Sequence, residues 1–140
     1  MIFDISPITT RHETACGPAA LKMLLGYYGQ EAELNALIRE CDARLIGCTA
    51  KDLLRVGRAH GLSDMMAVKC DDGGDVLTQD RPAIVWWRYQ HWIVYCGTDG
   101  DGKVVVCDPA RGRYRMSAGL FKSCFAGIEL TNGHPEDLPE

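Results

Sequence analysis

The N-terminal half of the chain carries apolar residues at the intervals of amphipathic helices. Three segments show this spacing and predict helices at residues 16–29, 31–41 and 49–61. In the first of them, Pro18 suits the first helical turn, where its missing N–H costs nothing, and Gly29 suits the C-terminal stop. The first half of the chain is therefore expected to be helical.

The third predicted helix has sequence signals at both ends. Thr49 is followed three residues later by Asp52, close to the pattern of a capping box, and Gly61 marks the stop. His60, just before that glycine, is suited to bind the last carbonyl groups of the helix, so we interpret it as structural. The acidic segment 71–75 lacks the ligand spacing and terminal glutamate of a calcium-binding EF-hand and is predicted to be a turn.

The second half of the chain has the apolar runs that are typical of β-strands. Strands are predicted at 82–90, 91–99 and 103–109, with a last short strand at 127–131. Residues 99–102, with the sequence DGDG, are a turn signal between the second and third of these strands. Helices followed by strands predict an α+β fold in which N-terminal helices pack on a C-terminal antiparallel sheet.

The chain has the length of one ordinary domain, at 140 residues. We expect residues 1–140 to form a single domain, with 131–140 as a flexible tail. The N-terminus lacks a secretory signal, and no window approaches the roughly 18 apolar residues of a membrane span. The sequence therefore predicts a cytoplasmic protein without membrane insertion.

Charge and cysteine content exclude several classes of function. The formal net charge is −4, which gives no electrostatic reason to expect nucleic-acid binding. The seven cysteines are odd in number and include no CxxC pair, which argues against a zinc site, a thioredoxin-like motif or a disulfide framework. We therefore expect no metal and no cofactor, and we interpret six of the cysteines as reduced, mostly buried thiols.

The remaining cysteine, Cys16, lies at the start of the first predicted helix, where exposed N–H groups and the helix dipole favour a thiolate. His91 opens one predicted strand and Asp108 ends the next. If these strands pair across the DGDG turn, His91 and Asp108 become neighbours. Each residue alone also fits a structural role: Cys16 as a small hydrophobe, His91 as a histidine packed in the sheet, and Asp108 as a turn former. Together they predict a thiol nucleophile, its base and the group that orients the base.

Four stretches of the sequence carry a family resemblance. ACGPAALKMLLGYYG, IGCTAKDLLRVGRAHGL, RPAIVWW with HWIVY, and VVVCDPARGRYRMSAGLF resemble the papain-like bacteriocin-processing peptidases, family 39 of the cysteine peptidases. Members cut leader peptides after a double glycine, often as the N-terminal domain of an ABC exporter. The resemblance runs from about Thr10 to about Leu130. It implies a papain-like α+β fold, with Cys16 as nucleophile, His91 as base and acid, and Asp108 as the orienting residue.

The chain departs from this family at one position. Members usually have a glutamine six residues before the cysteine, which donates to the oxyanion hole, and here that residue is Thr10. Loss of one such donor typically costs on the order of 10²–10³ in rate. Thr10, His12 and the Cys16 backbone N–H are the candidate substitutes, although an exposed loop position is the alternative interpretation of His12.

Two hypotheses of function follow. The first is a cysteine peptidase-like thiol hydrolase that acts on a peptide or amide, with a double-glycine leader peptide as one candidate substrate. The second is a catalytically weak or inactive peptide-binding module that retains the peptidase fold and holds an extended segment. The chain shows no transporter segment. We therefore expect a stand-alone relative whose partners are a peptide substrate and an ABC exporter encoded separately.

Overall fold

The computed structural model describes residues 1–42 and 47–133 of the chain. Its helical elements are a 3-10 turn η1 (Glu13–Ala15) and the helices α1 (Cys16–Tyr27), α2 (Leu34–Glu40), α3 (Ala50–Ala59), α4 (Gly74–Thr78) and α5 (Ala118–Cys124). Its strands are β1 (Met65–Lys69), β2 (Ala83–Trp87), β3 (His91–Thr98), β4 (Val104–Asp108), β5 (Gly112–Met116) and β6 (Phe125–Asn132).

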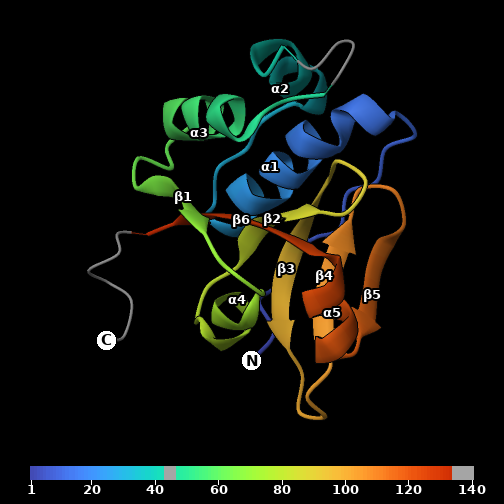
Figure 1. The fold of residues 1–140 in the computed structure, drawn as a ribbon. Coiled ribbons are helices and arrows are strands. Elements are labelled where there is room, and N and C mark those ends of the chain that lie inside the picture. Colours follow the sequence, from blue (N-terminus) through green and yellow to red (C-terminus); the bar gives the residue numbers. More distant parts are fainter. Residues whose placement is uncertain (43–46, 134–140) are drawn as a thin grey trace.

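The six strands of the described residues form one antiparallel sheet in the order β1-β6-β2-β3-β4-β5. Helix α1 packs mainly on the central strand β3, and α2 and α3 pack on α1. Figure 1 shows α1 between the sheet and the other two N-terminal helices. This arrangement confirms the predicted α+β fold, with N-terminal helices on an antiparallel sheet.

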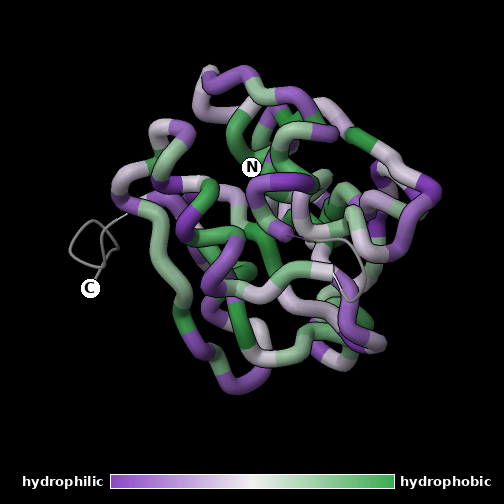
Figure 2. Tube along the Cα trace, turned by 90° about the horizontal axis from the view of Figure 1, so that it is seen from above, coloured by the Kyte–Doolittle hydropathy of each residue, from purple (hydrophilic) through white to green (hydrophobic). Residues whose placement is uncertain are grey.

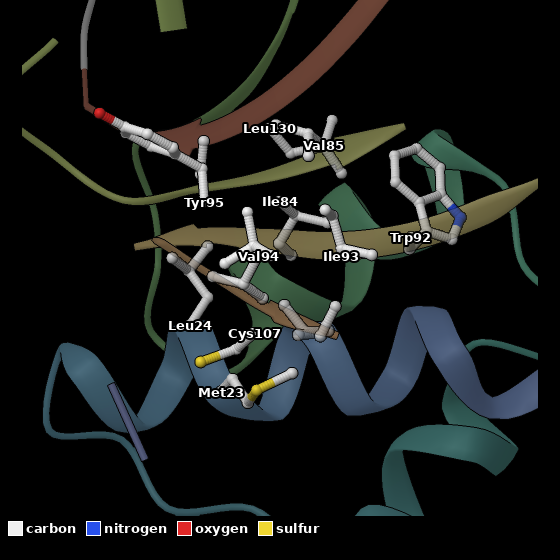
Figure 3. Packing of buried hydrophobic residues seen from close by; sticks show 14 of the residues in the cluster. Met23, Leu24, Ile84, Val85, Trp92, Ile93, Val94, Tyr95, Cys107 and Leu130 are labelled. Carbon is white, nitrogen blue, oxygen red and sulfur yellow. The ribbon is translucent and has the colours of Figure 1, made fainter. Parts of the chain in front are cut away.

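The core lies on both faces of the sheet. Figure 3 shows Met23 and Leu24 of α1 close to Val94 of β3 and Cys107 of β4, and all four are at most 2% exposed. On the alternate positions of β3, Tyr95 packs against Phe121 of α5. Burial on both faces explains why β3 reads as a continuous apolar run rather than an alternating one. In Figure 2 many hydrophobic stretches accordingly lie toward the interior of the molecule, and many outer loops are hydrophilic.

Helix α1 is buried around most of its circumference and ends in a Schellman motif. Gln30 N–H donates to Leu25 O at 2.9 Å and Gly29 N–H donates to Gly26 O at 3.1 Å. Gly29 has φ of +80°, the left-handed conformation that this motif needs and that glycine adopts without strain. The predicted stop of the first helix is therefore confirmed, with its physical cause.

Helix α3 begins as predicted. Thr49 and Asp52 form a complete capping box, because the Thr49 side chain accepts from Asp52 N–H and the Asp52 carboxylate accepts from Thr49 N–H. His60 follows the last helical residue, and its Nε2 lies 2.9 Å from Glu40 Oε2. This contact joins α3 to the end of α2.

Four elements were missed at the sequence level. Strand β1 interrupts the half that was expected to be helical, and it forms only because β6 returns to pair with it, with Met65 opposite Asn132. Helix α4 begins inside segment 71–75, which was expected to be a turn. Strand β5 and helix α5 follow β4. The expected flexible tail at 131–140 starts too early, because residues 131 and 132 belong to β6, and 134–140 lie outside the described residues.

No helix in the described part of the chain combines the length and the apolar character that crossing a bilayer requires.

Candidate active site

A cleft opens where the start of α1, the β2–β3 turn and the β4–β5 turn meet. It is lined by the segment before α1 with Cys16, by Cys48, by the β2–β3 turn with His91, and by the chain from Asp108 to α5. The cleft therefore contains Cys16, His91, Asp108, Thr10 and His12, the five site residues predicted from the sequence.

Cys16 is the first residue of α1 and follows η1 directly. The residue is only 5% exposed, yet it borders the cleft, so its side chain is accessible from that direction alone. Its own backbone N–H donates to Glu13 O, which closes the 3-10 turn. Because of this hydrogen bond, the Cys16 backbone N–H, one of the three candidate oxyanion donors, already has an acceptor within the protein.

Gly17 lets the start of α1 approach its neighbours closely. A Cβ at this position would lie 2.3 Å from Cys48 Sγ and 3.2 Å from Trp92 Cδ1. Trp92 Nε1–H in turn donates to Cys48 O at 3.1 Å. The absent side chain of Gly17 and the indole of Trp92 therefore hold Cys48 against the helix start.

His91 and Asp108 are brought together by the register of the β3–β4 hairpin. Val94 pairs with Cys107, and continuing this register by one residue places Asp108 opposite Ile93. His91 lies two residues before Ile93 on the same face, so it is the diagonal neighbour of Asp108. The two side chains meet with His91 Nε2 2.6 Å from Asp108 Oδ1.

The Asp108 carboxylate is 4% exposed and has three hydrogen-bond donors. Oδ1 accepts from His91 and from Ala110 N–H at 2.8 Å, and Oδ2 accepts from the Tyr114 hydroxyl at 3.4 Å. Burial alone would raise the pKa of Asp108, but the hydrogen bonds from His91 and Ala110 hold that pKa below its usual value. Asp108 is therefore a carboxylate at neutral pH.

His91 contacts both of its predicted partners. Burial disfavours the charged ring, but hydrogen bonds with Asp108 and with Cys16 outweigh burial and raise the pKa of His91 to about 9. Because Nε2 is bonded to Asp108, Nδ1 is the nitrogen that remains for Cys16. The structure thus bonds imidazole to carboxylate and places the thiol of Cys16 at the same cleft. A catalytic role for the three stays a prediction.

The β2–β3 turn forms one rim of the cleft and has an uncommon backbone. Trp87 pairs with His91, and the turn between them contains Tyr89 with φ of +65° and Gln90 with φ of +57°. Left-handed conformations in such residues carry a strain of about 1–3 kcal/mol each. The turn holds Tyr89 94% exposed beside the cleft.

The remaining oxyanion candidates differ in how free their donors are. Thr10 N–H is bonded to Pro109 O at 2.7 Å, and the Thr10 hydroxyl accepts from His12 N–H at 3.3 Å. The hydroxyl proton of Thr10 remains available, and the His12 ring is exposed at the cleft without a hydrogen bond to any described residue.

All seven cysteines are free thiols, and five of them are buried. Cys96 and Cys107 are neighbours on β3 and β4 with Sγ atoms 3.3 Å apart, and Cys41 contacts Cys48. Within residues 1–42 and 47–133, no group of three or more histidine, cysteine or acidic side chains is placed to hold a metal ion.

Three residues that support the site were missed at the sequence level: Gly17, Trp92 and Tyr114. A glycine directly after the predicted nucleophile was a signal for close packing. Tyr114 alternates with Arg113 and Arg115, which is the period of an exposed strand with one inward face. Trp92 carried no separate signal, because any aromatic residue fits an apolar strand.

Comparison with known proteins matches residues 4–136 to the model of the peptidase C39 family. The chain is 27% identical over 126 residues to the probable microcin-H47 secretion/processing ATP-binding protein MchF of Escherichia coli, covering 89% of this chain and 18% of that protein. It is 30% identical over 129 residues to an uncharacterised protein of Methanothermobacter marburgensis, covering 88% of this chain and 84% of that protein. The chain thus spans less than one fifth of the length of MchF.

Solved structures share the fold. A double glycine motif protease from an AMS/PCAT transporter, solved in complex with the leader peptide, has a TM-score of 0.82 at 24% identity, covering 94% of each chain. The peptidase domain of Streptococcus ComA has a TM-score of 0.72 at 22% identity, covering 89% of this chain and 95% of that one. With the family model matching nearly the whole chain, the conclusion is direct: this chain belongs to the peptidase C39 family.

Proposed function

We propose that the chain is a cysteine peptidase that cleaves a peptide after a double glycine, using Cys16, His91 and Asp108. The observation that carries the proposal is that His91 Nε2 lies 2.6 Å from Asp108 Oδ1 and that Cys16 lines the same cleft as both. This order of thiol, imidazole and carboxylate is what a thiol nucleophile needs from its base and from the group that orients the base.

The chemistry proceeds in two steps. In the first, the Cys16 thiolate attacks the scissile carbonyl carbon and forms a C–S bond, and the His91 imidazolium gives its proton to the amine as the C–N bond breaks. In the second, neutral His91 takes a proton from water, the hydroxide attacks the thioester, and the C–S bond breaks to return the thiolate. Asp108 stays ionised and keeps the ring oriented in both steps.

The tetrahedral oxyanion needs hydrogen-bond donors in addition to this machinery. The family's usual glutamine is replaced by Thr10, and Cys16 N–H already donates to Glu13 O. We propose the Thr10 hydroxyl and the His12 ring as donors. A short hydroxyl and an exposed ring are less preorganised than a held amide, so we expect amide hydrolysis to be slow without a specific substrate or partner.

The replacement of the family's usual oxyanion glutamine by Thr10 favours a second function. A chain that keeps the cleft but lacks a well-placed oxyanion donor fits a module that binds peptides without cutting them. Binding needs the walls of the cleft, which are present, whereas turnover also needs stabilisation of the transition state. The two functions are separated by whether a bound peptide is released as two fragments.

The partners and location of the protein are part of this proposal. MchF is described as a secretion/processing ATP-binding protein. We propose that this chain processes a leader peptide for an ABC exporter encoded separately, and that it works in the cytoplasm. We also propose that residues 1–140 act as one domain.

The test uses a synthetic peptide with an internal double glycine, followed by mass spectrometry of the products. Wild type should release two fragments, and Cys16→Ala should release none while still binding the uncut peptide. Cys70→Ala is the matched control, because Cys70 is a half-buried thiol at the end of β1 and does not line the cleft. If wild type binds the peptide but releases no fragments, the result supports the peptide-binding module instead. Absence of both binding and cleavage would refute both functions.

A further inference from the structure

The rim of the cleft carries a charge opposite to that of the whole chain. The chain has 15 Lys and Arg against 19 Asp and Glu, a formal net charge of −4. The side chains that line the cleft nevertheless include three arginines, Arg11, Arg88 and Arg111, against two acids, Glu13 and Asp108. All three arginines and Glu13 are exposed. A positive rim on a negative protein concentrates anionic ligands at the cleft.

Asp108 offsets only part of the positive charge at the rim, through its interaction with Arg111. It is 4% exposed, and its oxygens are occupied by His91, Ala110 and Tyr114. Its negative charge is matched by the charged His91 ring, whose pKa is raised to about 9. Glu13 is the one exposed acid among the described residues that line the cleft, against three exposed arginines.

None of the three guanidinium groups forms an ion pair or a side-chain hydrogen bond with a described residue, but Arg111 interacts electrostatically with Asp108. The ion pairs of the described part of the chain involve Arg55, His60, Arg81, His91 and Arg115, but none of the rim arginines. Their side chains also donate no hydrogen bond to a described residue, whereas those of Arg55, Arg58 and Arg115 do. Arginines that stabilise a fold usually form such contacts, so the exposed guanidinium groups of Arg11 and Arg88 are available for a ligand.

The backbone holds these arginines in place although their side chains are exposed. Arg88 N–H donates to Cys124 O at 3.0 Å, and Arg111 N–H donates to Asp108 O at 3.1 Å. Arg11 directly follows Thr10, whose N–H donates to Pro109 O at 2.7 Å. That bond ties the segment of Arg11 to the turn of Arg111, so these two flank one side of the cleft and Arg88 lies on the β2–β3 turn.

From this arrangement we infer that the cleft selects peptides that carry carboxylate side chains close to the cleaved bond. The inference deepens the proposed function and rests on it for the nature of the ligand as a peptide. A guanidinium group presents a planar fork of N–H donors that matches a carboxylate in two parallel hydrogen bonds. Because the rim is exposed, the attraction is screened by salt and acts on the rate of association as well as on affinity.

The experiment measures binding separately from cleavage. Two fluorescein-labelled peptides of 20 residues share an internal double glycine and differ only in four positions, Glu in one and Gln in the other. Fluorescence anisotropy with the Cys16→Ala protein gives both dissociation constants without turnover. We expect the Glu peptide to bind about three- to tenfold more tightly at low salt, with the difference lost near 1 M salt.

Charge reversal identifies the arginines responsible. Arg11→Glu and Arg88→Glu should each remove most of the preference for the Glu peptide, measured as the ratio of the two dissociation constants. Arg113→Glu is the matched control, because Arg113 is exposed on β5 and does not line the cleft. Equal affinity of the two peptides for Cys16→Ala would overturn the inference, even if wild type cleaved both. Acid preference in binding without any cleavage would support it and refute only the peptidase activity.

A third peptide, with phosphoserine at the same four positions, tests whether the rim is built for another anion. We expect it to bind no more tightly than the Glu peptide. Much tighter binding, lost in Arg11→Glu, would overturn the assignment to carboxylates and indicate a phosphopeptide site.

Discussion

His91 Nε2 lies 2.6 Å from Asp108 Oδ1, across two strands that are neighbours in both sequence and space. The bond ties the first residue of β3 to the last residue of β4, next to the start of α1, where Cys16 lies. A short charge-assisted bond of this kind fixes the ring nitrogen that faces the thiol.

The charge on His91 should depend on Asp108. In Asp108→Asn we expect the pKa of His91 to fall from about 9 toward its ordinary value, because the hydrogen bond and the negative charge that favour the imidazolium are removed. NMR titration of the imidazole resonances measures this directly. Asp99→Asn is the matched control, because Asp99 pairs with Arg115 in an exposed turn and does not contact His91. An unchanged His91 titration in Asp108→Asn would contradict the assignment of the partner.

Stability should fall on the alkaline side because of the same ring. The pKa of His91 is raised from 6.5 to about 9 on folding, so its contribution is fully present below pH 6.5 and is lost as pH rises through 9. Urea unfolding of wild type and His91→Gln at pH 6 and pH 10 measures it. Wild type should lose about 2–3 kcal/mol more than the variant over this interval. Equal losses in the two proteins would show that His91 does not carry the effect.

Gly17 should tolerate no side chain. Gly17→Ala places a methyl group 2.3 Å from Cys48 Sγ, and the resulting shift should cost about 1–3 kcal/mol in free energy of unfolding and displace Cys16 from His91. Gly26→Ala is the control on the same helix, because its Cβ meets nothing within 4 Å, and it should gain about 0.4–1 kcal/mol. Denaturant unfolding and peptide cleavage of both variants provide the comparison. Full activity and stability in Gly17→Ala would contradict the packing at the start of α1.

Restoring the usual oxyanion donor should raise amide cleavage. Thr10→Gln supplies a side-chain N–H at the position where the family has one, and we expect at least about a tenfold gain, toward the 10²–10³ range of such donors. The gain should vanish in the double variant with Cys16→Ala. If Thr10→Gln brings no gain and His12→Ala inactivates wild type, His12 already serves as the donor. Vigorous cleavage that survives loss of both side chains would mean that the oxyanion hole lies elsewhere.

Cys16 should be the fast thiol toward iodoacetamide. It borders the cleft at a helix N-terminus beside the charged His91 ring, whereas Cys41, Cys96 and Cys107 are fully buried. Mass spectrometry of peptides after brief labelling at pH 6 should find the label on Cys16 first. Faster labelling of Cys70 or Cys124, the two half-buried thiols, would show that exposure alone decides reactivity.

Local pattern was sufficient where an element depends on its own residues. The three N-terminal helices, the capping box of Thr49 and the stop at Gly29 follow from side-chain spacing and from caps that act within one turn. The strands β2, β3 and β4 followed from continuous apolar runs. Strand β1 did not, because it exists only through pairing with β6, about 60 residues away. The pattern of helices followed by strands does not predict that a C-terminal strand pairs with a segment in the first half of the chain.

The same distinction holds for the candidate site. Residue types and chain order determined that Cys16, His91 and Asp108 were the candidates, because a hairpin turn between two apolar runs makes His91 and Asp108 neighbours by arithmetic. Only the tertiary structure decided that Asp108 also accepts from Tyr114 and that Trp92 Nε1–H donates to Cys48 O. It alone gathered three exposed arginines from distant turns around one cleft. Hydrogen bonds and charge clusters of this kind depend on distances between segments, which periodicity along the chain does not encode.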